Sequence, residues 1–182
     1  QVGGADVVLI GANDPEGMRR HTDECRFRGY PFAADPSQQL ARMDGDDIKP
    51  LIEGAEYLFT NEYEAALIEQ KTGWTAADLA AMVNVRVITL GPDGARIERR
   101  GCEPVLVGVP EEESKADPTG VGDAFRAGFL AGQSWGLSDE RSAQVGSLVA
   151  TYVIETIGTQ EYQLAQQHFL QRLATAYGDD AA

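Results

Sequence analysis

The sequence is poor in several residue types, and each scarcity narrows the possible classes of protein. Its 182 residues hold only two cysteines and two histidines, scattered rather than set at metal-ligand spacing, so we expect neither a disulfide framework nor a zinc site. No apolar run approaches the roughly 20 residues of a membrane span, which predicts a soluble protein. Basic residues are few, since 15 Lys and Arg face 29 Asp and Glu for a net charge of −14. That charge repels nucleic acids and anionic membranes, so we expect partners of neither kind.

Composition is otherwise that of a globular protein, with 43% hydrophobic and 24% charged residues. We predict one domain over residues 1–182, and the scarcity of cysteine favours the reducing cytoplasm. The two tryptophans, Trp74 and Trp135, are expected to pack in the core. The sequence opens without an initiator Met or a signal-peptide pattern, and an apolar strand follows at once. This opening suggests a piece of a longer protein.

Short β-branched runs alternate with helical patterns along the chain. The expected strands are Val7–Ile10, Tyr30–Ala34, Tyr57–Thr60, Val85–Leu90, Ala95–Arg99 and Val105–Val109. The expected helices are 15–27, 46–53, 61–71, 76–82, one around 121–130, one that Ser138 caps and whose apolar stripe reaches Ile157, and one around 165–176. Such alternation predicts an α/β fold with a mostly parallel sheet covered by helices, and the hairpin-like last strands predict an antiparallel edge. Ligands of such sheets bind beyond the carboxyl ends of the strands.

The most informative loop is Asp-Pro-Thr-Gly-Val-Gly-Asp at residues 117–123, which a helical pattern follows. Glycines at a helix entry let successive backbone N–H groups converge on an anion. Asp123 falls in the first turn, where a carboxylate stays ionised and can accept a proton from an attacking hydroxyl. The pattern therefore predicts phosphoryl transfer. From spacing alone, a second interpretation is equally favoured, in which the segment is a glycine turn and Asp123 only complements the helix dipole.

Three further loops carry polar or glycine residues at strand ends. Asn61 and Glu64 stand three apart at a helix start, which favours a capping box and leaves open a role toward phosphate and magnesium. The turn Thr89–Gly94 needs no functional explanation, although its backbone can face a nucleotide. Gln38 and Gln39 belong to a turn by default, and paired amides can also recognise a polar ligand.

Taken in order, these segments resemble the ribokinase-like (PfkB) family of sugar and nucleoside kinases. Residues Asp117–Leu130 match the family signature Asp-x-Thr-Gly-x-Gly-Asp with its small and apolar helix, Asn61–Glu64 match its N-x-x-E motif, and Thr89–Gly94 match its nucleotide-side glycine turn. The sequences of residues 35–39 and 158–161 are most similar to those of the adenosine kinases of this family, above all the actinobacterial type. Three motifs in the family's order favour the catalytic interpretation of Asp123.

The resemblance implies transfer of the γ-phosphoryl group of ATP to the 5′-hydroxyl of adenosine. It assigns the general base to Asp123. It also assigns the anion hole for the transferring charge to the backbone of Gly120, Val121 and Gly122. In related enzymes a monovalent cation, usually K⁺, sits behind the anion hole; Asp117 is the matching side chain, and the loop at Gly158 is the expected second wall.

The same resemblance gives expectations for the nucleotide and the acceptor. It implies that Asn61 and Glu64 position phosphate and Mg²⁺. The expected ATP-cleft residues are Thr89, Gly91 and Gly94. Gln38 and Gln39 favour adenosine as the acceptor, while a sugar such as ribose or a fructose phosphate stays an alternative.

One departure from the family pattern is length. The resemblance covers only the carboxyl-terminal part of the family fold, so we expect the N-terminal strands and the β lid to be absent. A lid excludes water and completes a site, which predicts low activity without it. We also expect an exposed sheet edge, and with it a homodimer or pairing with the missing segment. A non-catalytic nucleotide-binding module is the alternative outside the enzymes.

Overall fold

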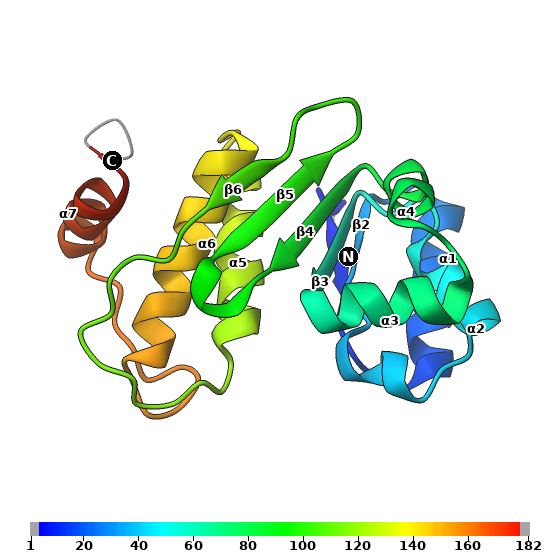
Figure 1. Ribbon diagram of the computed structural model, residues 1–182, viewed down its shortest axis with the longest axis horizontal. Coiled ribbons are helices and arrows are strands. Elements are labelled where there is room, and N and C mark those ends of the chain that lie inside the picture. The colour runs from blue at the N-terminus through cyan, green and yellow to red at the C-terminus, as the bar shows by residue number, and fades with distance from the viewer. Residues whose placement is uncertain (1–3, 179–182) are drawn as a thin grey trace. The chain divides into compact units, whose positions relative to one another are not determined.

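The computed structural model describes residues 4–178 and divides into two compact units. Unit 1 contains the chain up to Leu90 together with Arg96–Pro104, and unit 2 contains Gly91–Ala95 together with the chain from Val105 on. The fold is α/β, with a six-stranded sheet of order β1-β2-β3-β4-β5-β6 (Figure 1). This architecture confirms the fold class predicted from the alternating pattern, whereas the single domain over 1–182 stays a prediction.

The elements lie close to their expected ranges. The strands are β1 Val8–Ile10, β2 Phe32–Ala34, β3 Tyr57–Asn61, β4 Val85–Thr89, β5 Ala95–Arg99 and β6 Val105–Val107. The α-helices are α1 Pro15–Arg28, α2 Gly45–Ile52, α3 Glu62–Thr72, α4 Ala76–Met82, α5 Val121–Ser134, α6 Asp139–Ile154 and α7 Gln166–Tyr177, with 3₁₀ turns η1 Ser37–Ala41 and η2 Gly91–Asp93.

The first four strands of unit 1 are parallel neighbours, so their carboxyl ends lie at one edge of the sheet. The register places Ile10 beside Ala34, Ala34 beside Leu58, and Asn61 beside Thr89. Parallel strands need crossover connections, and helices supply them here. Figure 1 shows the helices α1 to α4 gathered beside these strands, and their shared core includes fully buried Leu40, Ile48 and Ile68.

Local sequence explains where the helices of unit 1 start and stop. Asp14 caps α1 by accepting a hydrogen bond from the Gly17 N–H (3.0 Å), and Gly29 ends it in the left-handed conformation at φ +68°. Helix α4 begins with a capping box between Thr75 and Asp78, whose side chains each bond the other's backbone N–H.

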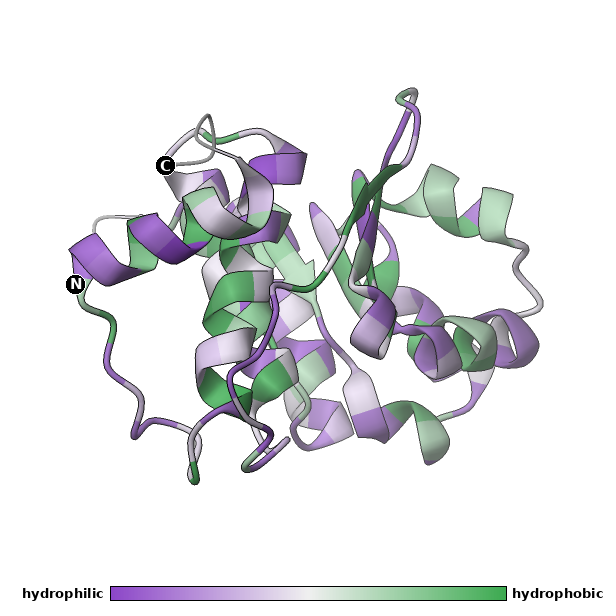
Figure 2. Cartoon of the chain, turned by 60° about the vertical axis from the view of Figure 1, so that its left-hand side comes forward, coloured by the Kyte–Doolittle hydropathy of each residue, from purple (hydrophilic) through white to green (hydrophobic). Residues whose placement is uncertain are grey.

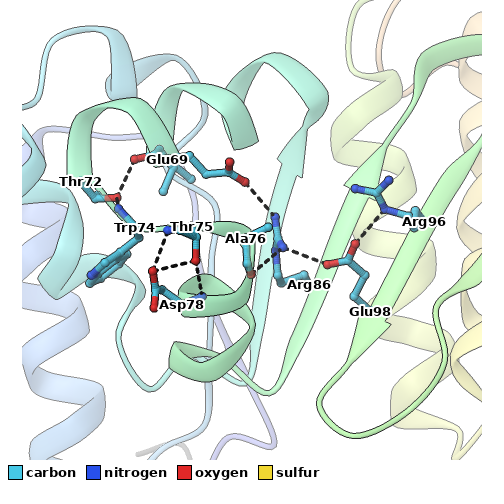
Figure 3. Close-up of polar contacts among 10 residues, drawn as sticks. Glu69, Thr72, Trp74, Thr75, Ala76, Asp78, Arg86, Arg96 and Glu98 are labelled. Carbon is cyan, nitrogen blue, oxygen red and sulfur yellow. Dashed lines mark hydrogen bonds and ion pairs between the residues drawn. The ribbon is translucent and has the colours of Figure 1, made fainter.

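A buried arginine joins four elements of unit 1 (Figure 3). Arg86 on β4 is 4% exposed, and its Nη1 lies 2.9 Å from the Glu98 carboxylate of β5 and 3.2 Å from the Ala76 carbonyl at the start of α4. Its Nη2 lies 3.9 Å from Glu69 of α3. Only the short turn 90–94 connects β4 to its neighbour β5, which requires antiparallel pairing. The expected antiparallel edge is therefore present at β5.

Two helices of unit 2 pack backbone against backbone. A Cβ on Gly128 of α5 would lie 2.8 Å from the Gly146 Cα of α6, and one on Gly132 would lie 2.8 Å from the Ser142 Cα. Since the helices approach this closely, α6 is buried along most of its length. Figure 2 shows hydrophilic and hydrophobic residues alternating along the helices. Ser138 caps α6 as expected, accepting from the Arg141 N–H at 3.2 Å.

Two local expectations are wrong, both beyond a helix end. Helix α6 stops at Ile154, so Ile157 lies outside the predicted apolar stripe and is 78% exposed. Trp135 is the C-cap residue of α5 and is 66% exposed rather than packed, whereas Trp74 packs against the core of unit 1. Within residues 4–178, every helix is too short or too polar to cross a bilayer.

Candidate active site

The start of α3 is the first candidate region, and it forms the predicted capping box. The Asn61 side chain accepts a hydrogen bond from the Glu64 N–H (2.8 Å), and the Glu64 carboxylate accepts one from the Asn61 N–H (2.9 Å). Glu64 is 8% exposed, so its carboxylate is largely enclosed. The structural interpretation of this motif is therefore correct. A function toward a ligand adds to the capping role and does not replace it.

The turn with the two glutamines lies against this capping box. Ser37 has a left-handed backbone at φ +45°, and its hydroxyl donates to the second Glu64 oxygen at 3.4 Å. Gln38 is exposed and Gln39 is half-buried in η1. Lys71 of α3 holds this segment by donating to backbone carbonyls that follow it, those of Leu40 (2.7 Å), Ala41 (3.1 Å) and Met43 (2.7 Å). The turn and the α3 start thus form one hydrogen-bonded group.

Ordinary backbone conformation and packing explain most of the predicted nucleotide-side turn. Thr89 is the sheet neighbour of Asn61, and its hydroxyl donates to the Thr60 carbonyl at 3.4 Å. Gly91 has φ +60° and open space around its Cα, whereas Gly94 has φ +94° and lies so close to the Val107 carbonyl that a Cβ would be 1.9 Å from it. Gly94 is therefore required by packing against β6, whatever its role toward a nucleotide.

The start of α5 in unit 2 is the second candidate region. Its N-cap is Gly120 at φ +83°, which supplies no capping side chain. The α-helical ladder begins with the Ala124 N–H donating to the Gly120 carbonyl (2.9 Å). The amides of Gly122 and Asp123 precede that bond, so they have no partner within the helix. Such a helix end is an anion-binding arrangement.

Gly120 also lies close to a second loop of unit 2. A Cβ on Gly120 would lie 2.9 Å from Cγ2 of Thr159, which belongs to the loop after α6. Both the positive φ and this contact require glycine here. The glycine turn 120–122 thus rests against the loop that follows α6.

Asp123 stands in the first turn of α5 with its side chain 86% exposed. Arg126, one turn later, places Nη1 3.5 Å from the Asp123 carboxylate with its own side chain 14% exposed. The Arg126 side chain runs along the first turn, because a Cβ on Gly122 would meet Nη1 at 2.6 Å. A carboxylate, a guanidinium and unpaired amides therefore gather at one helix end.

Asp117 joins the two loops of unit 2 that flank this helix end. Its carboxylate accepts hydrogen bonds from the Thr119 N–H (2.9 Å) and from the Gly158 N–H (3.4 Å). Bonds from Thr119, and then from the Gly158 amide, lower the pKa of Asp117 below its usual value. The family resemblance implies that the loop at Gly158 forms the second wall of a cation site at Asp117, and in the structure the Gly158 amide bonds the Asp117 carboxylate.

The candidate metal residues are single carboxylates. No group of three or more His, Cys, Asp or Glu side chains that could hold an ion occurs within residues 4–178. Magnesium at phosphate sites commonly takes one or two carboxylates and fills its other positions with water and phosphate oxygens. Glu64 in unit 1 and Asp117 in unit 2 each offer one hard oxygen donor, which fits such a bound ion but does not fit a site made of protein ligands alone.

Some candidate residues had no sequence signal. Ser37 contacts Glu64 across 27 positions, and Lys71 contacts the end of η1 across about 30 positions. A strained backbone at Ser37 and a lysine that donates to distant carbonyls are tertiary features, so no local pattern predicts them. Thr159 is a similar case, because only the fold brings it against Gly120.

Comparison with known proteins identifies the family. The family model described as pfkB family carbohydrate kinase matches residues 1–166. The nucleoside kinase of Methanocaldococcus jannaschii is 27% identical over 158 residues, which cover 85% of this chain and 51% of that protein. The chain thus spans about half the length of the curated relatives that it matches.

Solved structures give the same fold. The Burkholderia thailandensis nucleoside kinase in complex with inosine has a TM-score of 0.93 and 34% identity, over 98% of this chain and 59% of that one. The adenosine kinase of Sinorhizobium meliloti has a TM-score of 0.72 and 26% identity, over 97% and 54%. Nucleoside kinases are thus more similar to this chain than that adenosine kinase. With most of its length matched by the family model, the chain belongs to the pfkB family of carbohydrate kinases.

Proposed function

We propose that this chain carries the catalytic region of an ATP-dependent kinase that phosphorylates the 5′-hydroxyl of a purine nucleoside, with adenosine as the acceptor that the family resemblance implies. The observation that carries the proposal is the start of α5. There Gly120 at φ +83° leaves the helix amides without a capping side chain, and Asp123 stands 86% exposed beside them. Phosphoryl transfer needs these two devices, a cradle for the transferring charge and a base for the hydroxyl.

Unit 2 supplies the chemistry in this proposal. The Asp123 carboxylate accepts the proton of the attacking hydroxyl, while the amides of the turn Gly120–Gly122 bind the oxygens of the γ-phosphoryl group. Arg126 lies 3.5 Å from Asp123 and adds a positive charge at the same helix end. Since developing negative charge meets fixed donors there, little reorganisation is needed during the step.

Unit 1 supplies binding groups. Asn61 and Glu64 stand at the carboxyl edge of the parallel strands, next to Thr89 and to the turn with Gln38 and Gln39. Because the Glu64 carboxylate already accepts bonds from Asn61 and Ser37, its proposed action on Mg²⁺ is through bound water rather than as a sole ligand.

Two cations are implied by the family and fit the residues present. Mg²⁺ would be oriented by Glu64 and the phosphates, and it neutralises phosphate charge when bound. K⁺ would lie by Asp117, whose pKa is lowered and which joins the loops behind the glycine turn. Thr89, Gly91 and Gly94 are assigned to the ATP side.

The acceptor is proposed as a nucleoside because the named relatives are nucleoside kinases, one of them solved with inosine. A sugar acceptor is the second candidate, since the family model is named for carbohydrate kinases and a relative from Archaeoglobus fulgidus is called a sugar kinase at 30% identity. Gln38 and Gln39 favour the nucleoside, because paired amides match the hydrogen-bonding edge of a base.

The test is direct detection of product. The purified chain is incubated with Mg-ATP, KCl and one acceptor at a time, namely adenosine, inosine, ribose or fructose 6-phosphate, and the mixture is analysed by mass spectrometry. A blank preparation from cells without the gene controls for contaminating kinases. We expect a nucleoside monophosphate. A sugar phosphate alone would replace the acceptor, and no product from any acceptor, with ADP still bound on calorimetry, would favour a nucleotide-binding module.

A further inference from the structure

Helix α7 packs on α6 through apolar and charged side chains together. Leu173 is 3% exposed and packs against Leu148 and Tyr152 of α6. The Tyr152 ring stacks on Phe169 with centroids 6.1 Å apart. Enclosed beside these residues is one ion pair, between Arg172 of α7, with its side chain 14% exposed, and Glu155.

The Arg172 guanidinium uses several of its donors and one face. It bonds both oxygens of Glu155, Nη1 at 2.8 Å and Nη2 at 2.7 Å, and Nη2 also donates to the Glu111 carbonyl at 3.3 Å. Its Cζ lies 4.7 Å from the centroid of the Tyr152 ring. A planar fork with a face on an aromatic ring is a geometry that lysine does not reproduce.

The ion pair contacts the two loops that lead to the glycine turn, the loop 111–117 and the loop 155–159. Glu155, the C-cap of α6, also accepts from the Glu113 N–H at 2.8 Å. Glu111 and Glu113 belong to the segment that leads from β6 to Asp117, and Glu155 precedes the loop with Gly158.

Further bonds join these two loops beyond the ion pair. The Ile154 carbonyl accepts from the amides of Ala116 (2.7 Å) and Asp117 (3.2 Å), and the Gly158 N–H donates to Asp117. The Tyr177 hydroxyl at the end of α7 donates to the Gly108 carbonyl (2.7 Å), so α7 contacts the first segment at more than one point.

We propose that Arg172 is a positioning residue for the glycine turn Gly120–Gly122, acting through Glu155 and the two loops that meet at Asp117. The inference rests on the function proposed for that turn. Arg172 touches no reacting group. It fixes the separation of the loop 111–117 from the loop 155–159, and Thr159 of the second loop abuts Gly120.

A purely stabilising role explains the pair less well. Leu173 and the stacked rings already supply apolar contact between α7 and α6. Burying two charges costs solvation that their attraction only partly returns, so an enclosed ion pair adds little stability over apolar side chains. The pair instead adds orientation. A bidentate contact and a third hydrogen bond fix the angle and distance between the segment 111–117 and the start of the loop after α6.

The experiment compares hydrogen–deuterium exchange in the wild-type protein and in Arg172→Lys, followed by mass spectrometry of peptides. Lysine keeps the charge and loses the fork. We expect amides of 116–123 and 156–159 to exchange about tenfold faster, while the helix contact at 142–150 is unchanged. Glu155→Gln is the second variant, and it is expected to act on the same peptides should Arg172→Lys fold poorly.

Arg86→Lys is the matched control, since it makes the same change at a buried arginine of unit 1. We expect it to leave exchange in 116–123 at the wild-type rate. The proposal is overturned if Arg172→Lys and Glu155→Gln speed exchange only within α7, or equally throughout unit 2, because either result describes a structural role alone.

Kinetics on the acceptor found above provides the functional readout. We expect kcat for Arg172→Lys to fall about tenfold while KM for the acceptor stays within about twofold, as for misplaced transition-state donors. An unchanged kcat would overturn the positioning role. A wild-type chain without turnover would end the proposed function instead, and exchange at 116–123 would still decide whether Arg172 orders the turn.

Discussion

Helices α3 and α5 both carry a carboxylate at their third position, and they use it in opposite ways. In α3 the Glu64 carboxylate turns back to the Asn61 N–H, and Glu64 is 8% exposed. In α5 the N-cap is Gly120, which has no side chain to offer, and the Asp123 side chain is 86% exposed. One helix satisfies its own first turn, whereas the other leaves the amides of Gly122 and Asp123 without helical partners and its carboxylate exposed to solvent.

This difference suits the start of α3 to a structural role and the start of α5 to binding an anion. A capped helix start has little left to bind an anion, because its orphan amides already have partners. An uncapped start keeps that capacity, and it holds its place only if the backbone is fixed from outside. In unit 2 this support comes from Thr159 against Gly120 and from Asp117 bonded to Gly158. Substitutions in the α3 cap are therefore expected to change stability in addition to any effect on ligand binding, whereas those at the α5 start are expected to act mainly on rate.

The largest expected effect is on turnover, from Asp123→Asn. The amide cannot accept the hydroxyl proton as a carboxylate does, so we expect kcat to fall by about 10²–10⁴. The exposed side chain makes little contribution to the fold, and the free energy of unfolding should change by less than about 0.5 kcal/mol. Steady-state kinetics and urea unfolding on one preparation measure both. Turnover retained within about tenfold would remove Asp123 from the mechanism.

Glu64→Ala is the counterpart on α3. It removes the acceptor for the Asn61 N–H and for the Ser37 hydroxyl, so we expect about 1–2 kcal/mol of lost stability. Glu64→Gln keeps one acceptor and should recover most of that stability. Should Glu64→Gln unfold like Glu64→Ala, the charge rather than the cap would be responsible.

A third prediction concerns the buried ion pair of unit 1. Arg86→Met removes one of the two cationic partners of Glu98 and the donor to the Ala76 carbonyl, and we expect a loss of about 2 kcal/mol in the free energy of unfolding. The control is Arg96→Met, which removes the other, more exposed partner of Glu98 and should cost under about 1 kcal/mol. Equal losses from both variants would show that burial of Arg86 is not decisive.

Local sequence was sufficient for much of unit 1. Capping residues such as Asp14 and Asn61, and β-branched runs such as Val85–Thr89, carry their signal within a few positions. These elements were predicted to within about two residues, and their parallel order follows from alternation with helices. The antiparallel edge followed from the shortness of the turn at residues 90–94.

The parts that sequence could not supply are long-range. Ile157 continues the helical spacing of α6, but the chain leaves the helix at Ile154, so periodicity alone overran the end. Arg172 gives no signal at all, because its partner Glu155 and the Glu111 carbonyl are brought to it only by the fold. The roles of the site residues came from motif resemblance, and they stay proposals until the substitutions are made.

A fourth prediction compares two glycines of unit 2 that share a left-handed backbone. Gly120 (φ +83°) lies against Thr159, whereas Gly136 (φ +76°) has open space around it. We expect Gly136→Ala to lower the free energy of unfolding by about 1 kcal/mol, because alanine is strained in this backbone conformation. Gly120→Ala should cost about 1 kcal/mol more and lower kcat, since the crowded turn must shift. Thermal unfolding and kinetics measure both, and Thr159→Gly added to Gly120→Ala should recover the extra loss.

The smallest expected effect is the pH dependence of the Glu155–Arg172 pair. The bonds from Arg172 outweigh burial, and with the Glu113 N–H they lower the pKa of Glu155 in the folded protein. A carboxyl group whose pKa is lower in the folded than in the unfolded protein stabilises the folded state. This stabilisation is complete above the pKa of the unfolded protein, about 4.3, and it is lost as the pH falls through the lower pKa of the folded protein. The difference in unfolding free energy between wild type and Glu155→Gln should therefore be constant from pH 7 to about 5 and shrink below about 4.3, by on the order of 1 kcal/mol. In an Arg172→Met background the same difference should not vary over this range, because the cation that lowers the pKa is gone. A dependence that persists there would assign the shift to the Glu113 amide rather than to Arg172.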